Sequence, residues 1–445
     1  MARPTSAGAA DAGSDRLPAI AGSLREAARR FGTPLYLTDE ATVVAAGAEL
    51  AAAFPDPWIR QYSVKANDVA AVVALVTADR ADGSAPFGAN VVSRGEWAVA
   101  RAAGLPNERI TLEGVGKTDA DLAAAVRAAA TGDPLAWTAI ESADEAQVVL
   151  DRARRAGLGR AGRPALDVLL RLNPDVTPET QAVLAVGAGK SKFGMTETEL
   201  TAVVERLAAA GGAVRPRGIH LHIGSQLGAV DAWSDAVRRG LALLGLLRGG
   251  LPDMDTLDVG GGFAVAPLNE PGPRPERFAR ELPALIEAIP ADRRPTRLAI
   301  EPGRFLVARS GWLVGRVLHV RERGRTQIVL DTGMTELIRP ALYGGRHPIV
   351  ALTSLGRPVD GRPLDVGPEH SNLSAVHGPI CESTDELGEH DLPLLRRGDL
   401  VAIRDAGAYA ASLSSTYNGR PRPPQVMLAE DGRLVLARRR ATLRP

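Results

Sequence analysis

The sequence predicts an α/β fold, in which a (β/α)8 barrel of the TIM type is joined to a second, mostly antiparallel β domain. Three observations predict it. At 445 residues the chain is long enough for two domains, or for a barrel with an accessory domain. Up to about residue 305, eight short apolar segments alternate with alanine-rich amphipathic segments of helical period. Beyond residue 305 this alternation gives way to strand-like segments joined by turns.

The N-terminal residues 1–25 are expected to be a disordered leader, because they are rich in Ala, Gly and Asp and lack the apolar core of a signal peptide. A short helix and then a strand at 34–38 should follow. We assign residues 26–40 and 306–445 to the β domain and residues 41–305 to the barrel.

Near-continuous apolar strands separated by helices indicate a parallel sheet covered by helices. An open doubly wound sheet is the alternative to a closed barrel. A Pro-rich loop at 265–276 should follow the seventh strand. The eight candidate strands are IRQYSVK, ANVVS, RITLEG, WTAIES, DVLLRLN, RGIHLHIG, TLDVGGG and RLAIEPG.

Polar or unusual residues lie where these strands end, which is where barrel enzymes carry their chemistry. A set of residues chosen only for core packing would be scattered along the strands. The residues at the strand ends are Lys65, Ser93, Ser142, Asn173, His222, Ser225, Gly260, Gly261, Gly262, Glu301 and Arg304.

The composition narrows the kinds of function. Hydrophobic residues make up 45% of the chain and charged residues 24%, which is typical of a soluble globular protein. A formal net charge of +1 gives no support for a nucleic-acid partner. No apolar stretch is long enough to span a membrane. The single cysteine, Cys381, excludes an intrachain disulfide and fits a reducing cytoplasm.

Lys65 ends the first barrel strand in the stretch QYSVKAN. A lysine near a strand end usually extends its ammonium group to water. The alternative is an amine held in a cavity, where it can form a Schiff base with a carbonyl compound.

Three glycines, 260–262, end the seventh strand, where backbone amides could approach an anion without obstruction by side chains. A tight turn is the plain alternative. In AIEPGR, Glu301 could hold a proton on a heterocyclic nitrogen and Arg304 could bind phosphate or carboxylate, although such a pair is often a structural ion pair. Neither a GxGxxG nor a GxxxxGK[ST] motif supports nucleotide binding.

His220 and His222 are two apart on a predicted strand and should therefore share a face. No third cluster of ligands stands out beside them, so we expect no metal site. For His222 we expect a neutral imidazole stacked on a flat ring, and for His220 a core histidine. Arg339, Tyr343, Cys381, Glu382 and Tyr409 each have an ordinary structural explanation when taken singly.

Taken together and in order, eight motifs resemble those of the fold-type III pyridoxal-phosphate decarboxylases, and most of all those of the diaminopimelate decarboxylases. The resemblance extends from about residue 30 to residue 430. It implies an alanine-racemase-like barrel, pyridoxal 5'-phosphate (PLP) as cofactor, and a homodimer with active sites shared across its interface. The motifs are YSVKAN, SKFG, HLHIGSQ, LDVGGGF, EPGR, LIRPALYGGRH, GPICES and GAYAASLSSTYNGRPRP.

For the cofactor, the resemblance implies that Lys65 is the covalent anchor, that His222 stacks on the pyridine ring, and that Glu301 pairs with the pyridine nitrogen. A carboxylate in that place keeps the ring protonated, so that the ring can accept the electrons left at Cα by decarboxylation. The residues implied to hold the phosphate are Ser225, Gly260, Gly261, Gly262, Gly303, Arg304 and Tyr409.

For the substrate, the resemblance implies that Cys381 reaches across the dimer as proton donor and that Glu382 binds the distal amine. The carboxylate that is retained would be held by Arg304, Arg339, Tyr343 and Tyr409. Two arginines around one oxyanion would be left unpaired by a substrate with a single carboxylate. The predicted reaction is therefore decarboxylation of meso-2,6-diaminopimelate to L-lysine and CO2, in lysine biosynthesis.

Alternatives remain at this stage. The stretches PETQAVLAVGAGKSKFG and AVAPLNEPGPRP and the residue Thr384 differ from the family pattern, so a decarboxylase of a related diamino or acidic amino acid in a specialised pathway is one. An amino-acid racemase is another, although it would not need the Cys381–Glu382 pair. A PLP carrier without catalysis is the third, and the long C-terminal β domain argues against it.

Overall fold

The computed structural model describes residues 15–177, 187, 191–266, 272–359 and 372–442. The chain divides into two compact units. The barrel unit comprises residues 48–65 and 73–305, and the β unit comprises residues up to 47, residues 66–72 and residues from 306 onward. The two stretches that differ from the family pattern lie partly outside the described residues, at 178–186, 188–190 and 267–271.

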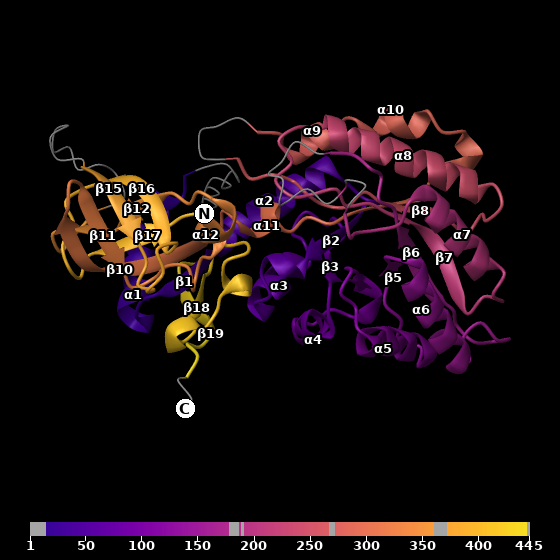
Figure 1. The fold of residues 1–445 in the computed structure, drawn as a ribbon, viewed down its shortest axis with the longest axis horizontal. Coiled ribbons are helices and arrows are strands. Elements are labelled where there is room, and N and C mark those ends of the chain that lie inside the picture. Colours follow the sequence, from indigo (N-terminus) through magenta and orange to yellow (C-terminus); the bar gives the residue numbers. More distant parts are fainter. Residues whose placement is uncertain (1–14, 178–186, 188–190, 267–271, 360–371, 443–445) are drawn as a thin grey trace, which may run out of the picture. The chain divides into compact units, whose positions relative to one another are not determined.

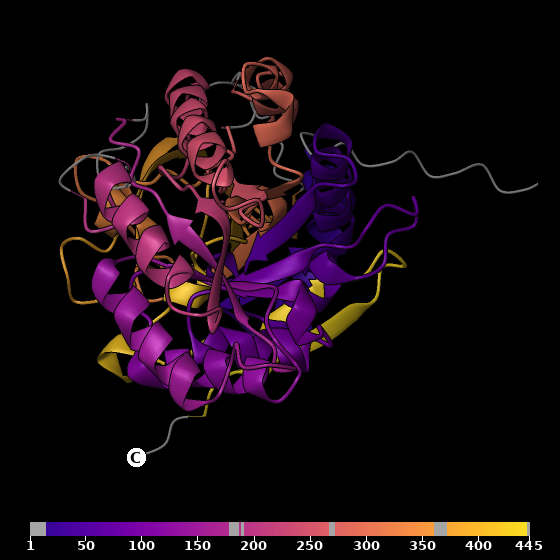
Figure 2. The same cartoon turned by 90° about the vertical axis from the view of Figure 1, so that its right-hand side faces the viewer.

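The barrel unit contains a closed barrel of eight parallel strands, and Figure 2 shows helices arranged around it. The ring closes where Ile59 and Arg60 of the first strand pair with Ala299 and Ile300 of the last. All eight predicted strands are confirmed, and the open doubly wound sheet is excluded. In chain order the strands are β2 (Ile59–Ser63), β3 (Gly88–Val91), β4 (Ile110–Leu112), β5 (Trp137–Ile140), β6 (Leu166–Arg171), β7 (Val214–His220), β8 (Thr256–Asp258) and β9 (Arg297–Ile300).

The helices of the barrel follow from apolar stripes and from N-terminal caps. In α6 (Ala143–Arg155), the buried residues Ala146, Val149, Leu150 and Ala153 recur at helical spacing and form one face. The other helices around the barrel are α2 (Glu40–Ala53), α3 (Ala70–Thr77), α4 (Arg94–Ala102), α5 (Asp119–Ala130), α7 (Glu197–Ala208), α8 (Asp231–Arg248), α9 (Pro275–Ala279), α10 (Leu282–Glu287) and α11 (Arg304–Val307).

Ser93 and Ser142, two of the polar residues at strand ends, are helix N-caps. The Ser93 hydroxyl accepts a hydrogen bond from the amide of Glu96, and the Ser142 hydroxyl accepts one from the amide of Glu145. Such caps satisfy amides that the first turn of a helix leaves unpaired. Their place at the strand ends therefore has a structural cause.

The β unit is built on a mixed, mostly antiparallel sheet, as predicted. Its main strand order is β16-β15-β11-β10-β1-β18-β19, and β12 and β17 join it through β10 (Figure 1). The pairs β1–β18 and β11–β15 are parallel. The strands are β1 (Leu35–Asp39), β10 (Gly311–Glu322), β11 (Thr326–Leu330), β12 (Ile349–Ala351), β15 (Asn372–His377), β16 (Glu386–Leu392), β17 (Leu400–Ile403), β18 (Gln425–Leu428) and β19 (Leu434–Arg438), with a small hairpin of β13 (Thr353–Ser354) and β14 (Arg357–Pro358).

Two apolar cores form on opposite faces of this sheet. Tyr36 and Leu313 belong to one core, whereas their strand neighbours Leu35, Leu37 and Trp312 belong to the other. This division follows from the alternation of side chains along a strand. The unit also contains the one-turn helix α12 (Arg339–Tyr343).

The helix α1 (Leu17–Phe31) corrects the predicted leader. Residues 1–14 lie outside the described residues, but the helix begins eight residues before the predicted end of the leader. Leu17, Ile20 and Leu24 are buried in the second core, and Arg16 pairs with the buried Asp39 at 3.0 Å. Composition over the first twenty residues concealed this short apolar stripe. No helix within the described ranges is both long and apolar enough to cross a membrane.

Candidate active site

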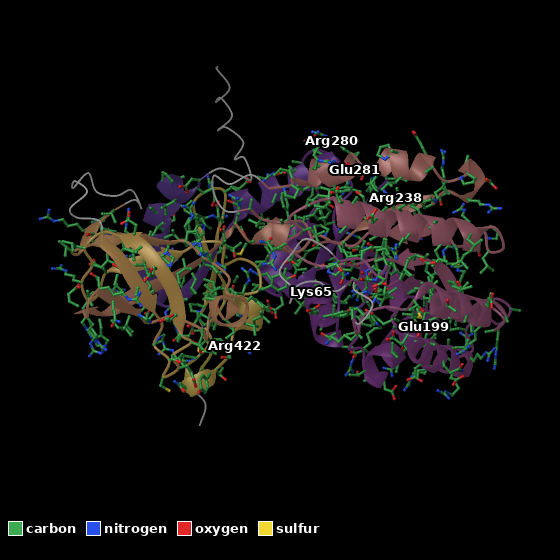
Figure 3. All side chains as sticks on the ribbon, turned by 45° about the horizontal axis from the view of Figure 1, so that its top comes forward. Lys65, Glu199, Arg238, Arg280, Glu281 and Arg422 are labelled. Atoms are coloured by element: carbon green, nitrogen blue, oxygen red, sulfur yellow. The ribbon has the colours of Figure 1, made fainter. Side chains whose placement is uncertain are left out.

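Lys65 lies in the short 3-10 helix η1 (Val64–Ala66) directly after β2, and its side chain is half-buried (Figure 3). No ion pair involves Lys65 in the part of the chain that the structure describes. Its positive charge contributes to the electrostatics of the neighbouring strand ends, because it lowers the pKa of both His220 and His222. A half-buried lysine without a carboxylate partner at the C-terminal end of a barrel strand is suited to reaction with a carbonyl group.

His222 follows β7 and is held as a neutral imidazole. Burial is the first cause that lowers its pKa well below the ordinary value, and the charges of Lys65 and Arg171 lower it further. The amide of Gly261 donates to Nδ1 of His222 at 3.3 Å. The guanidinium of Arg171 donates to the carbonyl oxygen of His222 at 3.4 Å. The ring is therefore neutral and is contacted at Nδ1 by the backbone after β8, while Arg171 of β6 holds the backbone of His222. A neutral ring is what stacking on a flat ring requires.

Ser225 and Arg304 form a polar pair at the ends of β7 and β9. Nε and one terminal nitrogen of Arg304 donate to the Ser225 hydroxyl at 3.3 and 3.1 Å. Gly303 is buried beside Arg304. A hydroxyl and a guanidinium together are donors suited to a phosphate group.

The triple glycine allows backbone to approach backbone at this end of the barrel. A Cβ on Gly261 would overlap the carbonyl oxygen of Glu301, and a Cβ on Gly262 would lie 2.8 Å from the carbonyl oxygen of Gly224. Gly262 also has a φ of +101°, which disfavours any L side chain. Larger residues would force the ends of β7, β8 and β9 apart. The lysine, the neutral ring and the anion donors thus fit a phosphorylated carbonyl cofactor.

Glu301 follows β9 and points into a buried polar cluster inside the barrel. Asn90 of β3 donates to Glu301 and also to Glu113, which follows β4. Nε2 of His220 lies 3.4 Å from Glu301 and 3.3 Å from Glu113. His220 is therefore a neighbour of two carboxyl groups, and the sequence did not predict this cluster.

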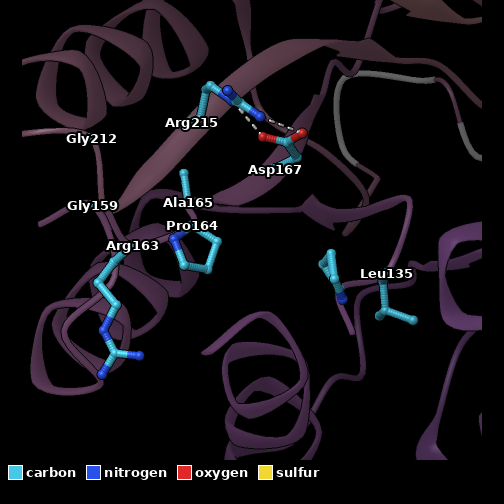
Figure 4. Close-up of a pocket in the computed structure, with 9 residues that line it drawn as sticks. Leu135, Gly159, Arg163, Pro164, Ala165, Asp167, Gly212 and Arg215 are labelled. Carbon is cyan, nitrogen blue, oxygen red and sulfur yellow. Dashed lines mark hydrogen bonds and ion pairs between the residues drawn. The ribbon is translucent and has the colours of Figure 1, made fainter. Parts of the chain in front are cut away.

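A cavity of about 520 Å³ lies at the opposite, N-terminal ends of β6 and β7 (Figure 4). Arg215 and Asp167 form an ion pair at its edge, with both nitrogen–oxygen contacts at 2.6 and 3.0 Å. Barrel enzymes carry their chemistry at the other end of the strands. We therefore treat this cavity as separate from the candidate active site.

Five predicted site residues belong to the β unit, and Arg339 is one of them. A terminal nitrogen of Arg339 lies 2.9 Å from Nε2 of His347, and Nδ1 of His347 lies 2.9 Å from the carbonyl oxygen of Arg404. Since Arg339 can only donate, these partners assign the proton of His347 to Nδ1. The buried His347 thus orients the guanidinium of Arg339.

Cys381 and Glu382 lie on an exposed loop, where the side chains of Tyr417 and Asn418 contact them. The amide nitrogen of the Asn418 side chain lies 3.4 Å from the sulfur of Cys381, and the Tyr417 hydroxyl donates to Glu382 at 2.6 Å. Cys381 itself is exposed in the single chain. The buried carboxylate of Asp385 accepts from the amides of Met334 and Ile380 at 2.6 and 2.8 Å and so fixes the base of the loop.

Tyr409 and Tyr343 complete the predicted set. Tyr409 has a φ of +56°, an unusual value for a residue with a side chain. Its amide donates at 2.8 Å to the carbonyl oxygen of Ala66, the residue that follows Lys65 in the chain. Tyr343 is the last residue of α12, four positions after Arg339. Backbone strain of this kind gathers at functional sites.

The sequence missed the supporting residues, namely Asn90, Glu113, Arg171, Asp258, His347, Asp385 and Tyr417. The sequence held a signal for Glu113, because this residue directly follows a barrel strand, as the predicted Glu301 does. For His347 and Asp385 no comparable signal exists, since their partners lie in other elements of the β unit.

Comparison with known proteins gives consistent matches. Residues 40–308 match the family model described as "Pyridoxal-dependent decarboxylase, pyridoxal binding domain". The chain is 36% identical to a diaminopimelate decarboxylase of Deinococcus radiodurans, over 94% of this chain and 96% of that protein. It is 34% identical to one of Aquifex aeolicus, over 94% and 91%. A diaminopimelate decarboxylase from Helicobacter pylori, solved in complex with L-lysine, superposes with a TM-score of 0.81 at 27% identity, over 94% of this chain and 97% of that one.

Proposed function

The chain belongs to the pyridoxal-dependent decarboxylases, and on this premise we propose its reaction, the roles of its residues and its assembly. It is a PLP-dependent amino-acid decarboxylase that converts meso-2,6-diaminopimelate to L-lysine and CO2, a step of lysine biosynthesis. Relatives named diaminopimelate decarboxylase match nearly its whole length, and one solved neighbour of that name binds L-lysine.

One observation carries the proposal. Lys65, without an ion-pair partner among the described residues, follows a barrel strand and lies close enough to the neutral His222 to influence its charge. In this proposal Lys65 is the covalent anchor of PLP and His222 stacks on its ring. Glu301 holds a proton on the pyridine nitrogen.

The phosphate of the cofactor is assigned to the donors at the ends of β7, β8 and β9. The Ser225–Arg304 pair supplies a hydroxyl and a guanidinium, and the triple glycine lets the backbone after β8 pack closely against the backbone after β7 and β9. When bound, the cofactor supplies an electron sink for the pair of electrons left at Cα when CO2 departs. The residues proposed here are Ser225, Gly260, Gly261, Gly262, Gly303, Arg304 and Tyr409.

The β-unit residues are assigned to the substrate. Arg339, oriented by His347, binds the carboxylate that is retained, together with Arg304, Tyr343 and Tyr409. Glu382, oriented by the Tyr417 hydroxyl, binds the distal amine. Cys381 returns a proton to Cα, which requires a thiol kept reduced and supports a cytoplasmic enzyme.

We also propose a homodimer in which Cys381 serves the active site of the partner subunit. The exposure of Cys381 and Glu382 in the single chain supports this arrangement, because a proton donor has to be enclosed to work efficiently. The mass of the purified protein in solution tests it. A monomer that is fully active would contradict the assignment of Cys381.

The reaction is tested by CO2 release and amino-acid analysis with the PLP-loaded protein. The substrates are meso-diaminopimelate, L-lysine, L-ornithine and L-arginine. We expect CO2 and an equal amount of L-lysine from diaminopimelate and no release from the other three. Release from a substrate with one carboxylate would contradict the substrate and the role of Arg339, while release from none would contradict the reaction.

A further inference from the structure

Five polar side chains meet inside the barrel, each contributed by a different strand or the residue that follows it. They are Asn90 (β3), Glu113 (after β4), His220 (β7), Asp258 (β8) and Glu301 (after β9), and none is more than 3% exposed. Among the described residues, no lysine or arginine forms an ion pair with any of the three carboxyl groups. Three unpaired carboxylates cannot all be ionised in a dry interior.

Glu113 and Glu301 are bridged by the same two side chains. The Asn90 amide donates to Glu113 at 2.8 Å and also to Glu301. Nε2 of His220 lies 3.3 Å from Glu113 and 3.4 Å from Glu301. The indole of Trp137 donates to the remaining oxygen of Glu113 at 3.1 Å and fixes the orientation of that carboxyl group.

The protons of the cluster follow from burial and from like charge. Burial, followed by the charge of Glu301, raises the pKa of Glu113 to about 8. The same two causes raise the pKa of Asp258 well above its ordinary range. Burial lowers the pKa of His220 to about 4, so its ring is neutral. At neutral pH Glu113 and Asp258 thus retain their protons and can act as hydrogen-bond donors.

We propose that Glu113 is a positioning residue for Glu301, to which it donates a hydrogen bond as a neutral acid inside the barrel. The inference rests on the proposed role of Glu301 at the pyridine nitrogen. The donated bond fixes the direction of the Glu301 carboxylate, and a carboxylate fixed in this way keeps the proton on the ring nitrogen. An ionised Glu113 would instead repel Glu301 and disturb its orientation.

Two variants of Glu113, both uncharged and similar in size, test whether the hydrogen bond donated to Glu301 matters. Glu113→Gln is neutral and retains an N–H group that can donate to Glu301, whereas Glu113→Leu removes the donor. The Kd of PLP is measured by titrating the apo protein and following the cofactor absorbance, and thermal unfolding of each apo variant reports whether it folds. We expect the Gln variant to bind PLP within about threefold of wild type, and the Leu variant to bind about tenfold more weakly or worse.

The pH dependence of PLP binding provides a second readout. The titratable groups of the cluster are Glu113, Glu301, His220 and Asp258, and the charges of Lys65, Arg171 and Glu141 also act on His220. Because Glu113 ionises near pH 8, wild-type affinity should fall as the pH rises through that value. The Gln variant should lack this loss.

Three outcomes would overturn the inference. A folded Leu variant that binds PLP as tightly as wild type would show that the donated bond is unimportant. A Gln variant as weak as the Leu variant would show that Glu113 acts through its charge. Glu113, His220 and Glu301 also present ligand atoms within 4.8 Å of one another. If a chelator of divalent metals lowers the affinity for PLP, a metal ion rather than a shared proton joins these side chains. Wild-type protein that fails to bind PLP would refute the proposed function instead.

Discussion

The loop that carries Cys381 and Glu382 should depend on the buried carboxylate of Asp385. This side chain accepts hydrogen bonds from the amides of Met334 and Ile380 at 2.6 and 2.8 Å. Asp385 is only 3% exposed, and burial raises its pKa because it disfavours the charged carboxylate. The two amides act in the opposite direction, since their hydrogen bonds stabilise the charge. The perturbation is Asp385→Ala, which removes both acceptors, with Asp385→Asn as the milder change.

The magnitude follows from the two hydrogen bonds. A hydrogen bond to a charged group contributes about 1.5–3 kcal/mol, so losing both should lower the free energy of unfolding by about 3–6 kcal/mol. Asn retains one acceptor and turns an N–H group toward the other amide, so we expect a loss of about 1.5–3 kcal/mol. Misplacement of Cys381 should also lower kcat by about 100-fold in the Ala variant.

Urea unfolding and CO2 release from diaminopimelate provide the assay, and the absorbance of bound PLP confirms that the cofactor site is intact. The matched control is Glu386→Ala, a neighbouring carboxylate that is 59% exposed and lies 3.7 Å from His377. The control should stay close to wild type, because exposed pairs contribute little. An Ala variant as stable and active as this control would refute the reasoning.

Further predictions concern pH and substrate binding. Between pH 6.5 and 8, the folded chain retains the Glu113 proton, whose pKa is raised to about 8 from 4.5, and the unfolded chain has lost it, so stability should fall with rising pH. The fall is about 1.4 kcal/mol per pH unit, or about 2 kcal/mol over the window. His220, whose pKa is lowered to about 4 from 6.5, makes stability rise with pH, but only below this window. The free energy of unfolding, measured with urea and plotted against pH, should therefore fall more steeply for wild type than for Glu113→Gln. Parallel plots for the two proteins would contradict the assignment. Arg339→Ala should lower kcat/KM for diaminopimelate by about 10- to 100-fold, mainly through KM, while the exposed neighbour Arg346→Ala should not. Equal kinetics of the two variants would refute the carboxylate-binding role.

Much of the fold could be predicted, because its signals are local. Each barrel strand is a short apolar run, and Lys65, His222 and Glu301 lie one or two residues after a strand ends. The spacing of these runs predicted a barrel, with an open doubly wound sheet as the alternative, and the structure has the closed barrel. The start of α1 was missed, since an apolar stripe of Leu17, Ile20 and Leu24 is diluted by the Ala- and Gly-rich residues around it.

The supporting residues of the site could not be predicted in the same way. Glu113 resembles any acidic residue after a strand until Asn90, Trp137 and His220 are placed around it. His347 acquires its role only through contacts with Arg339 and Arg404. Such roles depend on contacts between residues far apart in the sequence, and periodicity does not report them.

Identification of the lysine that carries the cofactor tests the central claim most directly. The chain has only four lysines, Lys65, Lys117, Lys190 and Lys192. The PLP-loaded protein is reduced with borohydride, digested, and mapped by mass spectrometry, which locates a phosphopyridoxyl group fixed to a lysine side chain. We expect the group on Lys65 alone. The group on any of the other three lysines, or on none, would contradict the assignment of the active site.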